Sequence, residues 1–187
     1  MHILELFNWI DLLIVCLIIR VVYAGFIGGI FVELFKTLAL AVAIFVGLHY
    51  YSGISNAFFS KFGVGRGLID FFILGFLVIL VFVAFRFIRE GLLVFVKAKI
   101  PSEVDRWGGM IIAVARGVLA SSLVFLMLNA CDVPHIEKQL RRSFIRPSVK
   151  SFAPAVYRGI FDGIVSLIPT EQLNKAAMKL EYLTGEQ

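Results

Sequence analysis

Apolar residues gather in four long runs along the chain, and short groups of charged residues and glycines separate these runs. The runs cover residues 9–26, 30–48, 68–87 and 109–128. Each run is close to the roughly 20 residues that a helix needs to cross about 30 Å of hydrocarbon. In water, runs of this length would leave apolar patches larger than soluble monomers expose. The pattern predicts an all-α polytopic membrane protein with four transmembrane helices.

The remaining residues predict one membrane domain followed by a tail. We expect residues 1–129 to form the four-span domain and residues 130–187 to form a tail of amphipathic helices. Apolar residues recur every three to four positions over residues 149–167, which indicates a helix that starts near Pro154. A last helix is expected after Pro169. These amphipathic segments are too short to span a bilayer and are expected to lie along its surface.

Composition and charge support a membrane protein and argue against nucleic-acid binding. Hydrophobic residues make up 60% of the chain, and its mean hydropathy is +0.93. The net charge of +5 comes mainly from Lys and Arg beside the apolar runs, where such residues anchor helices at lipid headgroups. A nucleic-acid binder would instead cluster them on a soluble face. The expected partners are therefore the lipid bilayer and other membrane proteins or a second copy of the chain.

Two charged residues in the first run suggest where its helix begins and ends. Asp11 follows a good N-cap, Asn8, so its carboxylate meets the positive end of the helix dipole. The alternative is an intramembrane ion or proton site. Arg20 would lie near the middle of the bilayer if the helix continued into the second run, at a cost of at least ~2.5–3.5 kcal/mol. A turn between Gly25 and Gly29 avoids this cost.

The later charged residues predict an ion pair inside the membrane domain. Glu33 and Lys36 are three residues apart and can pair on one helix. Arg116 lies inside the fourth run and needs a partner, for which Glu33 and Asp105 are the candidates. The charged segment between the third and fourth runs predicts a surface helix that ends at Pro101.

Small residues at a spacing of four predict close helix packing. The stripes are Gly25/Gly29, Ala39/Ala43/Gly47 and Gly109/Ala113/Gly117/Ser121. Such stripes let two helix backbones approach closely in a membrane. We expect the stripe of residues 109–117 to pack on that of residues 39–47, and the third run, which has few small residues, to face lipid.

No enzyme motif accompanies these features. The sequence lacks H-E-x-x-H, G-x-S-x-G, a Walker loop and C-x-x-C, so we expect no catalytic site and no cofactor. His135 with Asp132 and Glu137 could ligate a metal, but Pro134 and the start of a surface helix explain these residues better. No metal site is therefore predicted.

The most specific motif is Asp105-Arg106-Trp107-Gly108-Gly109, with Arg116-Gly117 downstream. Here the sequence resembles the colicin V production protein family of bacterial inner-membrane proteins. The likeness extends to Asn8-Trp9-Ile10-Asp11, to Gly25, Gly29 and Glu33-Leu34, and to Ser143, Pro147 and Pro154. Relatives usually carry arginines around the first turn, where this chain has Ala24, Gly28 and Val32. The resemblance implies a four-span inner-membrane protein required to produce and export a peptide toxin.

Two functions follow as hypotheses. The first is a non-enzymatic membrane factor that assists toxin export or envelope maintenance. The second is a small channel or transporter lined by Asp11, Arg20, Glu33, Arg116 and Asn129, which would need an oligomer because four spans are too few for an inverted-repeat carrier. An intramembrane enzyme would lack a nucleophile–base pair. The candidate functional polar residues are Asp11, Arg20, Glu33, Asp105, Arg106 and Arg116, and the candidate packing residues are Gly25, Gly29, Gly108, Gly109, Ala113 and Gly117.

Overall fold

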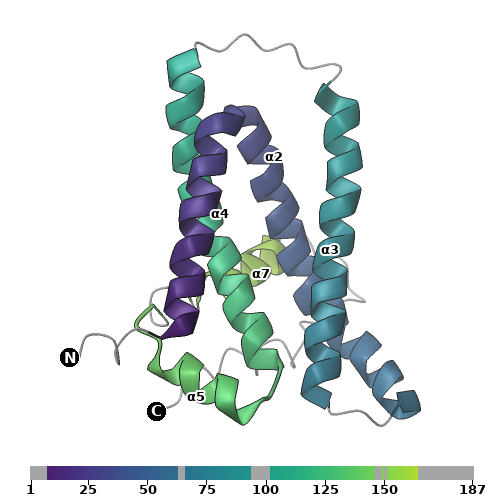
Figure 1. The fold of residues 1–187 in the computed structure, drawn as a ribbon. Coiled ribbons are helices and arrows are strands. Elements are labelled where there is room, and N and C mark those ends of the chain that lie inside the picture. The colour runs from purple at the N-terminus through teal and green to yellow at the C-terminus, as the bar shows by residue number, and fades with distance from the viewer. Residues whose placement is uncertain (1–7, 63–65, 94–101, 146–148, 150, 164–187) are drawn as a thin grey trace, which may run out of the picture.

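The computed structural model describes residues 8–62, 66–93, 102–145, 149 and 151–163. Its elements are α2 (Trp9–Phe62), α3 (Arg66–Leu93), α4 (Ser102–Ala130), α5 (Pro134–Arg142) and α7 (Phe152–Gly163). The prediction of an all-α fold is confirmed for this part of the chain (Figure 1).

A break at Gly29 divides α2 into two arms. Gly29 has φ 75° and ψ 170°, far from helical values. The positive φ favours glycine, which has no Cβ to clash there. The chain reverses direction at this break, so that a first arm (residues 9–28) and a second arm (residues 30–62) run antiparallel (Figure 1). The turn predicted from the glycines is confirmed, and it lies at the last of them.

Among the described residues, three helices are long and apolar enough to cross a membrane, where the sequence predicts four. They cover Trp9–Phe58, Gly67–Gly91 and Glu103–Ala130. The difference arises because the first and second predicted spans belong to one helix with a break inside it. The second predicted span was also expected to end at Leu48, but helix geometry continues to Phe62, because no proline stops it and Gly47 and Gly53 keep helical geometry. These helices indicate a multi-pass membrane protein.

The helices meet in two apolar clusters. The larger cluster joins the second arm of α2, α3, α4 and α7 through Leu40, Ile44, Leu48, Leu74, Leu77, Leu123, Leu126 and Tyr157. The smaller cluster joins the first arm, α4 and α5 through Ile10, Ile14, Phe125 and Leu140. Inside a bilayer, such clusters stabilise the bundle by close van der Waals packing, since lipid tails are as apolar as these side chains.

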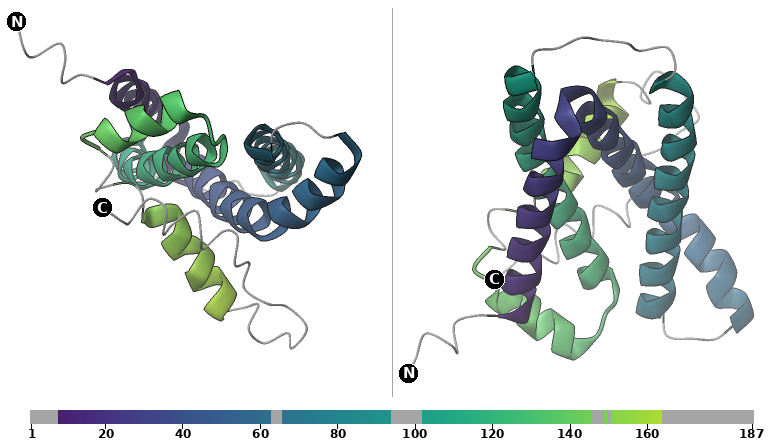
Figure 2. Two further views of the ribbon diagram at one scale, coloured as in Figure 1. Left: turned by 90° about the horizontal axis from the view of Figure 1, so that it is seen from below. Right: turned by 45° about the horizontal axis from the view of Figure 1, so that its top comes forward.

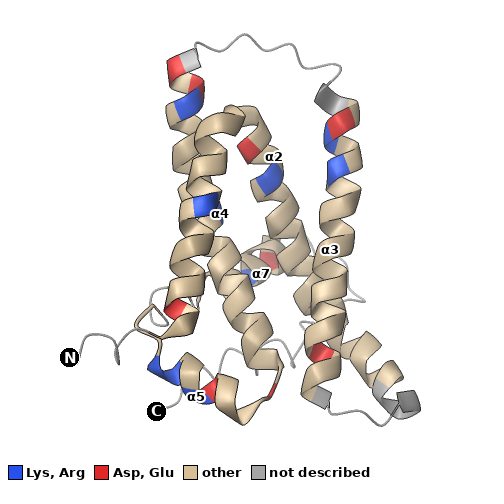
Figure 3. Cartoon of the chain, viewed as in Figure 1, with Lys and Arg blue, Asp and Glu red and all other residues tan. Residues whose placement is uncertain are grey.

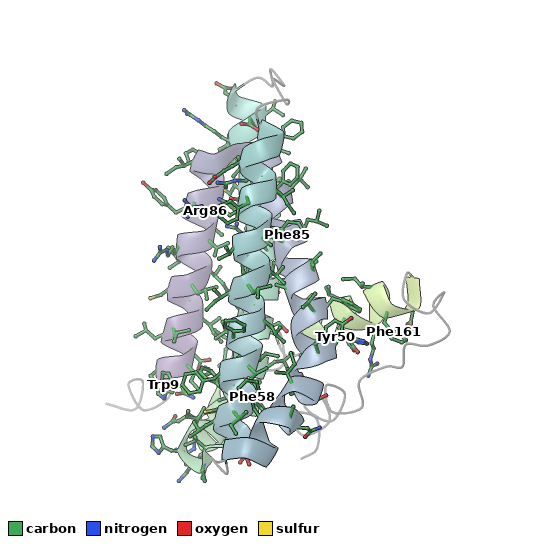
Figure 4. The ribbon with its side chains drawn as sticks, turned by 90° about the vertical axis from the view of Figure 1, so that its right-hand side faces the viewer. Trp9, Tyr50, Phe58, Phe85, Arg86 and Phe161 are labelled. Atoms are coloured by element: carbon green, nitrogen blue, oxygen red, sulfur yellow. The ribbon has the colours of Figure 1, made fainter. Side chains whose placement is uncertain are left out.

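One face of α3 packs on the bundle, and its other face is bare. Leu74 is fully buried, whereas Phe72, Phe76 and Phe87 are 69%, 64% and 70% exposed. Figure 4 looks at this side of the molecule, with α3 in front. The expectation that the third run faces lipid stays a prediction, and the exposure of these rings agrees with it.

The segment between the third and fourth runs departs from its prediction. α3 continues through Arg86 and Arg89 to Leu93, so these residues belong to the long helix and not to a separate surface helix. The continuous apolar spacing into Leu92 and Leu93 gives the helix no reason to end at residue 87. Residues 94–101 lie outside the described part, and α4 begins at Ser102, where a helix start is expected.

The described part of the tail packs against the bundle. α7 begins two residues before the predicted Pro154 and crosses beside the second arm of α2 and α4 (Figure 2). The amide N–H of Ala153 donates to Ser122 Oγ of α4 at 2.8 Å, and Tyr157 is buried. The helix predicted after Pro169 lies outside the described residues.

Candidate functional site

The turn in α2 is held by a carboxylate from α4. Ile30, the first residue after the break, donates its amide N–H to Asp105 Oδ1 at 2.8 Å. This amide would otherwise have no partner at the start of the second arm, so Asp105 serves as its N-cap and also meets the positive end of its dipole. Sequence reasoning selected Asp105 but missed this role, because caps are normally sought among adjacent residues.

The same turn makes a close backbone contact with α4. A Cβ atom on Gly109 would lie 2.6 Å from the carbonyl oxygen of Gly25 and 2.9 Å from the carbonyl carbon of Gly29. A side chain at this position is therefore excluded. Ala113 lies against Gly25, and Gly108 lies against Ile30. We call this contact between the α2 turn and residues 105–113 the glycine contact.

The predicted partner of the α4 stripe is therefore wrong. The stripe of residues 109–117 was expected to pack on Ala39, Ala43 and Gly47, but it packs on the turn and on the first arm, where Gly117 lies near Ile18. Gly47 instead faces Leu74 of α3. The error has a simple cause, since three stripes share one spacing and the spacing does not select among them.

An ion pair lies next to this contact. Arg116 Nη2 on α4 is 2.9 Å from Glu33 Oε2 on the second arm, and Glu33 is completely buried. Lys36 Nζ donates to Glu33 Oε1 at 2.7 Å. Both predicted pairings of Glu33 are confirmed. Asp105 is not the partner of Arg116, because the two residues lie about 16 Å apart along the axis of α4. The Asp105 carboxylate binds the Ile30 amide instead.

A cavity of about 380 Å³ opens beside the ion pair, between the second arm of α2, α3 and α4. Its basic lining residues are Lys36, Arg86, Arg89 and Arg116, and its apolar ones are Phe35, Ala39, Phe82 and Phe85. Figure 3 shows basic residues on the second arm and on α3 at the end of the molecule that carries the turn.

The cationic groups of the cavity are unevenly partnered. Arg86 Nε donates to Glu90 Oε1 at 3.1 Å on the outer surface of α3. Arg89 Nε is buried and has no hydrogen-bond partner among the described residues. Sequence reasoning missed this cavity, although residues 82, 85, 86 and 89 share one face of a helix and give the signal that could have found it.

Asp11 lies at the start of α2, at the end of the first arm that is away from the turn. Its carboxylate accepts hydrogen bonds from the hydroxyl of Ser143, from the Phe144 amide at 3.2 Å and from the Ile145 amide at 3.4 Å. Asn8 Nδ2 donates to the carbonyl oxygen of Gln139 in α5. These contacts fasten the start of α2 to the chain after α4, which favours the structural interpretation of Asp11 over an ion site.

The other candidates lie apart from these contacts. Arg20 is exposed on the first arm, and Arg106 lies 6.0 Å from the ring centre of Phe26. Of the five residues proposed to line a channel, the structure brings Glu33 and Arg116 together. Within the described ranges, no three His, Cys, Asp or Glu side chains gather in a group that could hold a metal ion.

Comparison with known proteins gives one match. A family model described as Colicin V production protein matches residues 10–154. The match includes both segments of the glycine contact, the Glu33–Arg116 pair and the Asp11–Ser143 contact. Neither the curated proteins nor the solved structures give a match.

Proposed function

Because the chain belongs to the colicin V production protein family, we propose that it is a non-enzymatic protein of the bacterial inner membrane. In this proposal it takes part in the production and export of a colicin V-type toxin and in maintenance of the envelope. It acts by holding other membrane proteins, or a second copy of itself, in place.

The bonds that Glu33 and Asp105 make inside the bundle are the main support for this proposal. Glu33 is bound to Arg116 and Lys36, and Asp105 is bound to the Ile30 amide. Charged groups inside a membrane are costly and usually mark either a function or a structural bond. The partners of these two carboxylates lie within the chain, which supports a structural use of Glu33 and Asp105 and not the handling of a substrate.

The bare face of α3 is the surface through which such a protein would hold a partner. Phe72, Phe76 and Ile79 expose about two thirds of their surface on this face. In a membrane, this face contacts either lipid or another transmembrane helix. We propose that a membrane protein or a second copy docks there in the toxin-producing cell.

We also propose four crossings, with each arm of α2 crossing once. The first arm has 20 residues, and at 1.5 Å per residue it is about 30 Å long, which matches the hydrocarbon core. Its reversal at Gly29 then lies at one membrane face, together with the end of α3 and the start of α4 (Figure 1).

The functional test uses a toxin-producing strain from which the gene for this chain is deleted. We expect less active toxin in the medium, with recovery when the chain is supplied. A photo-crosslinking residue at Phe76 should capture a membrane protein or a second copy, whereas one at Tyr23, equally exposed on the first arm, should not. Unchanged toxin output without the chain would contradict the proposal.

An oligomeric small channel or transporter is the alternative, and the charged cavity beside Arg116 favours it. Reconstitution into liposomes separates the two functions. Flux of ions or small solutes that depends on Arg116 would support the alternative, and its absence alongside normal toxin export would support the first proposal.

A further inference from the structure

We propose that the cavity beside Arg116 binds the headgroup of an anionic phospholipid. The phosphate would lie among Lys36, Arg86, Arg89 and Arg116, and the acyl chains would follow the phenylalanines of α3 toward the bilayer. This inference concerns a ligand site and does not depend on the role in toxin production.

The charge balance of the cavity favours the binding of an anion. Four cations line it, and two carboxylates contact them: Glu33 is bound to Lys36 and Arg116, and Glu90 is bound to Arg86. Four positive and two negative charges leave two positive charges. An excess of charge at the edge of the hydrocarbon is costly, and a bound anion would offset that cost.

Arg89 supplies the sharpest evidence. Its Nε is buried and lacks a hydrogen-bond partner among the described residues, while its side chain lines the cavity. A buried donor of this kind is costly when it remains unpaired. A phosphate oxygen in the cavity is the natural acceptor, because a guanidinium matches the geometry of phosphate oxygens.

The depth of the cavity fits a lipid headgroup. Glu33 and Lys36 follow Gly29 by four and seven residues, which places them about 6 and 10 Å below the turn along the helix. Over this distance the long side chains of Lys and Arg can extend from the helix toward the headgroup phosphates. Basic residues near the membrane surface attract anionic lipids.

The apolar lining favours a lipid over a free anion. Phe35, Phe82 and Phe85 share the cavity with the basic residues, and Phe85 lies next to Arg86 on the upper part of α3 (Figure 4). A free phosphate would gain nothing from these rings, whereas the start of an acyl chain packs on them. The volume of about 380 Å³ is within the usual range for small-molecule sites.

The test offers the purified full chain an equal mixture of phosphatidylglycerol and phosphatidylcholine with the same acyl chains, and native mass spectrometry counts the lipids retained. We expect retention of phosphatidylglycerol with a preference of about tenfold or more over phosphatidylcholine. The double variant R86Q/R89Q should lose this preference. The control R106Q/R141Q removes the same charge outside the cavity and should keep it.

Three results would overturn the proposal. They are equal retention of both lipids by the wild-type chain, equal loss in both double variants, and complete displacement of phosphatidylglycerol by millimolar inorganic phosphate, which would assign the cavity to a free anion. If R86Q/R89Q fails to fold, R89Q alone gives the same test, because Arg89 Nε makes no hydrogen bond that the described fold needs.

Discussion

Arg116 on α4 and Glu33 on α2 form an ion pair of 2.9 Å, and Glu33 has no exposed surface. Since a charge in this position is costly without a partner, each residue explains why the other is tolerated. The pair also joins the second arm of α2 to α4 next to the glycine contact. The two interactions together fix how these helices cross.

Removing Arg116 should therefore destabilise the protein. Arg116→Leu leaves Glu33 with Lys36 alone, and we expect a loss of about 3–5 kcal/mol in the free energy of unfolding. Arg116→Lys keeps the charge and should retain part of the stability. Unfolding in detergent, followed by circular dichroism, measures both. Equal stability of the two variants would argue against a bond that depends on charge.

Adding one methyl group at the glycine contact should lower the stability of the protein, whereas the same addition at an open glycine should not. Gly109→Ala places a Cβ 2.6 Å from the Gly25 carbonyl oxygen and should lower the melting temperature. Gly91→Ala, also in a helix but with no atom within 4 Å of the new Cβ, should leave stability unchanged or raise it by about 0.5–1 kcal/mol. If Gly109→Ala is as stable as Gly91→Ala, the two backbones do not approach this closely.

Loss of the Asp105 carboxylate should loosen the start of the second arm. Asp105→Ala leaves the Ile30 amide without its acceptor, at an expected cost of about 0.5–2 kcal/mol. Hydrogen exchange of the Ile30 amide should become faster. Glu103→Ala removes an exposed carboxylate from the same first turn of α4 and should leave that amide protected.

Asp11 should protect the chain that follows α5. In Asp11→Ala, the amides of Phe144 and Ile145 lose their acceptor and should exchange faster with solvent. Glu137→Ala, which removes a carboxylate that bonds only Arg141 in the described structure, serves as the control. No change in exchange at residues 144 and 145 would mean that Asp11 does not hold this segment.

Labelling of single cysteines can test the fourth of the proposed crossings, that of α4. With Cys16 and Cys131 replaced by alanine, cysteines at Gly91 and Trp107 should react with an impermeant reagent from one side of the membrane. Cysteines at Asp132 and Phe144 should react from the other side. Labelling of all four positions from one side would rule out four crossings.

Local patterns in the sequence were enough to predict the helices and one of their bonds. The turn at Gly25–Gly29 and the need of Arg116 for an acidic partner, with Glu33 and Asp105 as candidates, follow from the cost of charge in a membrane, which applies wherever the other helices lie. The ends of the helices were predicted less well. The third span was expected to end at residue 87, but α3 continues to Leu93, because charged residues at a membrane face do not stop a helix.

Contacts between distant segments could not be predicted in the same way. The stripe at Gly109 matches several others in spacing, so its partner depends on how the bundle folds. The same is true of Asp105, which binds the amide of Ile30, a residue 75 positions earlier in the sequence. The cavity needs side chains from three helices, and it becomes visible only when those helices are placed together.

The bond between Asp105 and Ile30 also sets an order of assembly. During synthesis, Ile30 enters the membrane 75 residues before its acceptor is made. If each arm crosses the membrane as we propose, the two arms of α2 insert as a hairpin whose turn lacks its cap until α4 is made. A chain truncated after α3 should accordingly be cleaved by proteases more readily than the full chain.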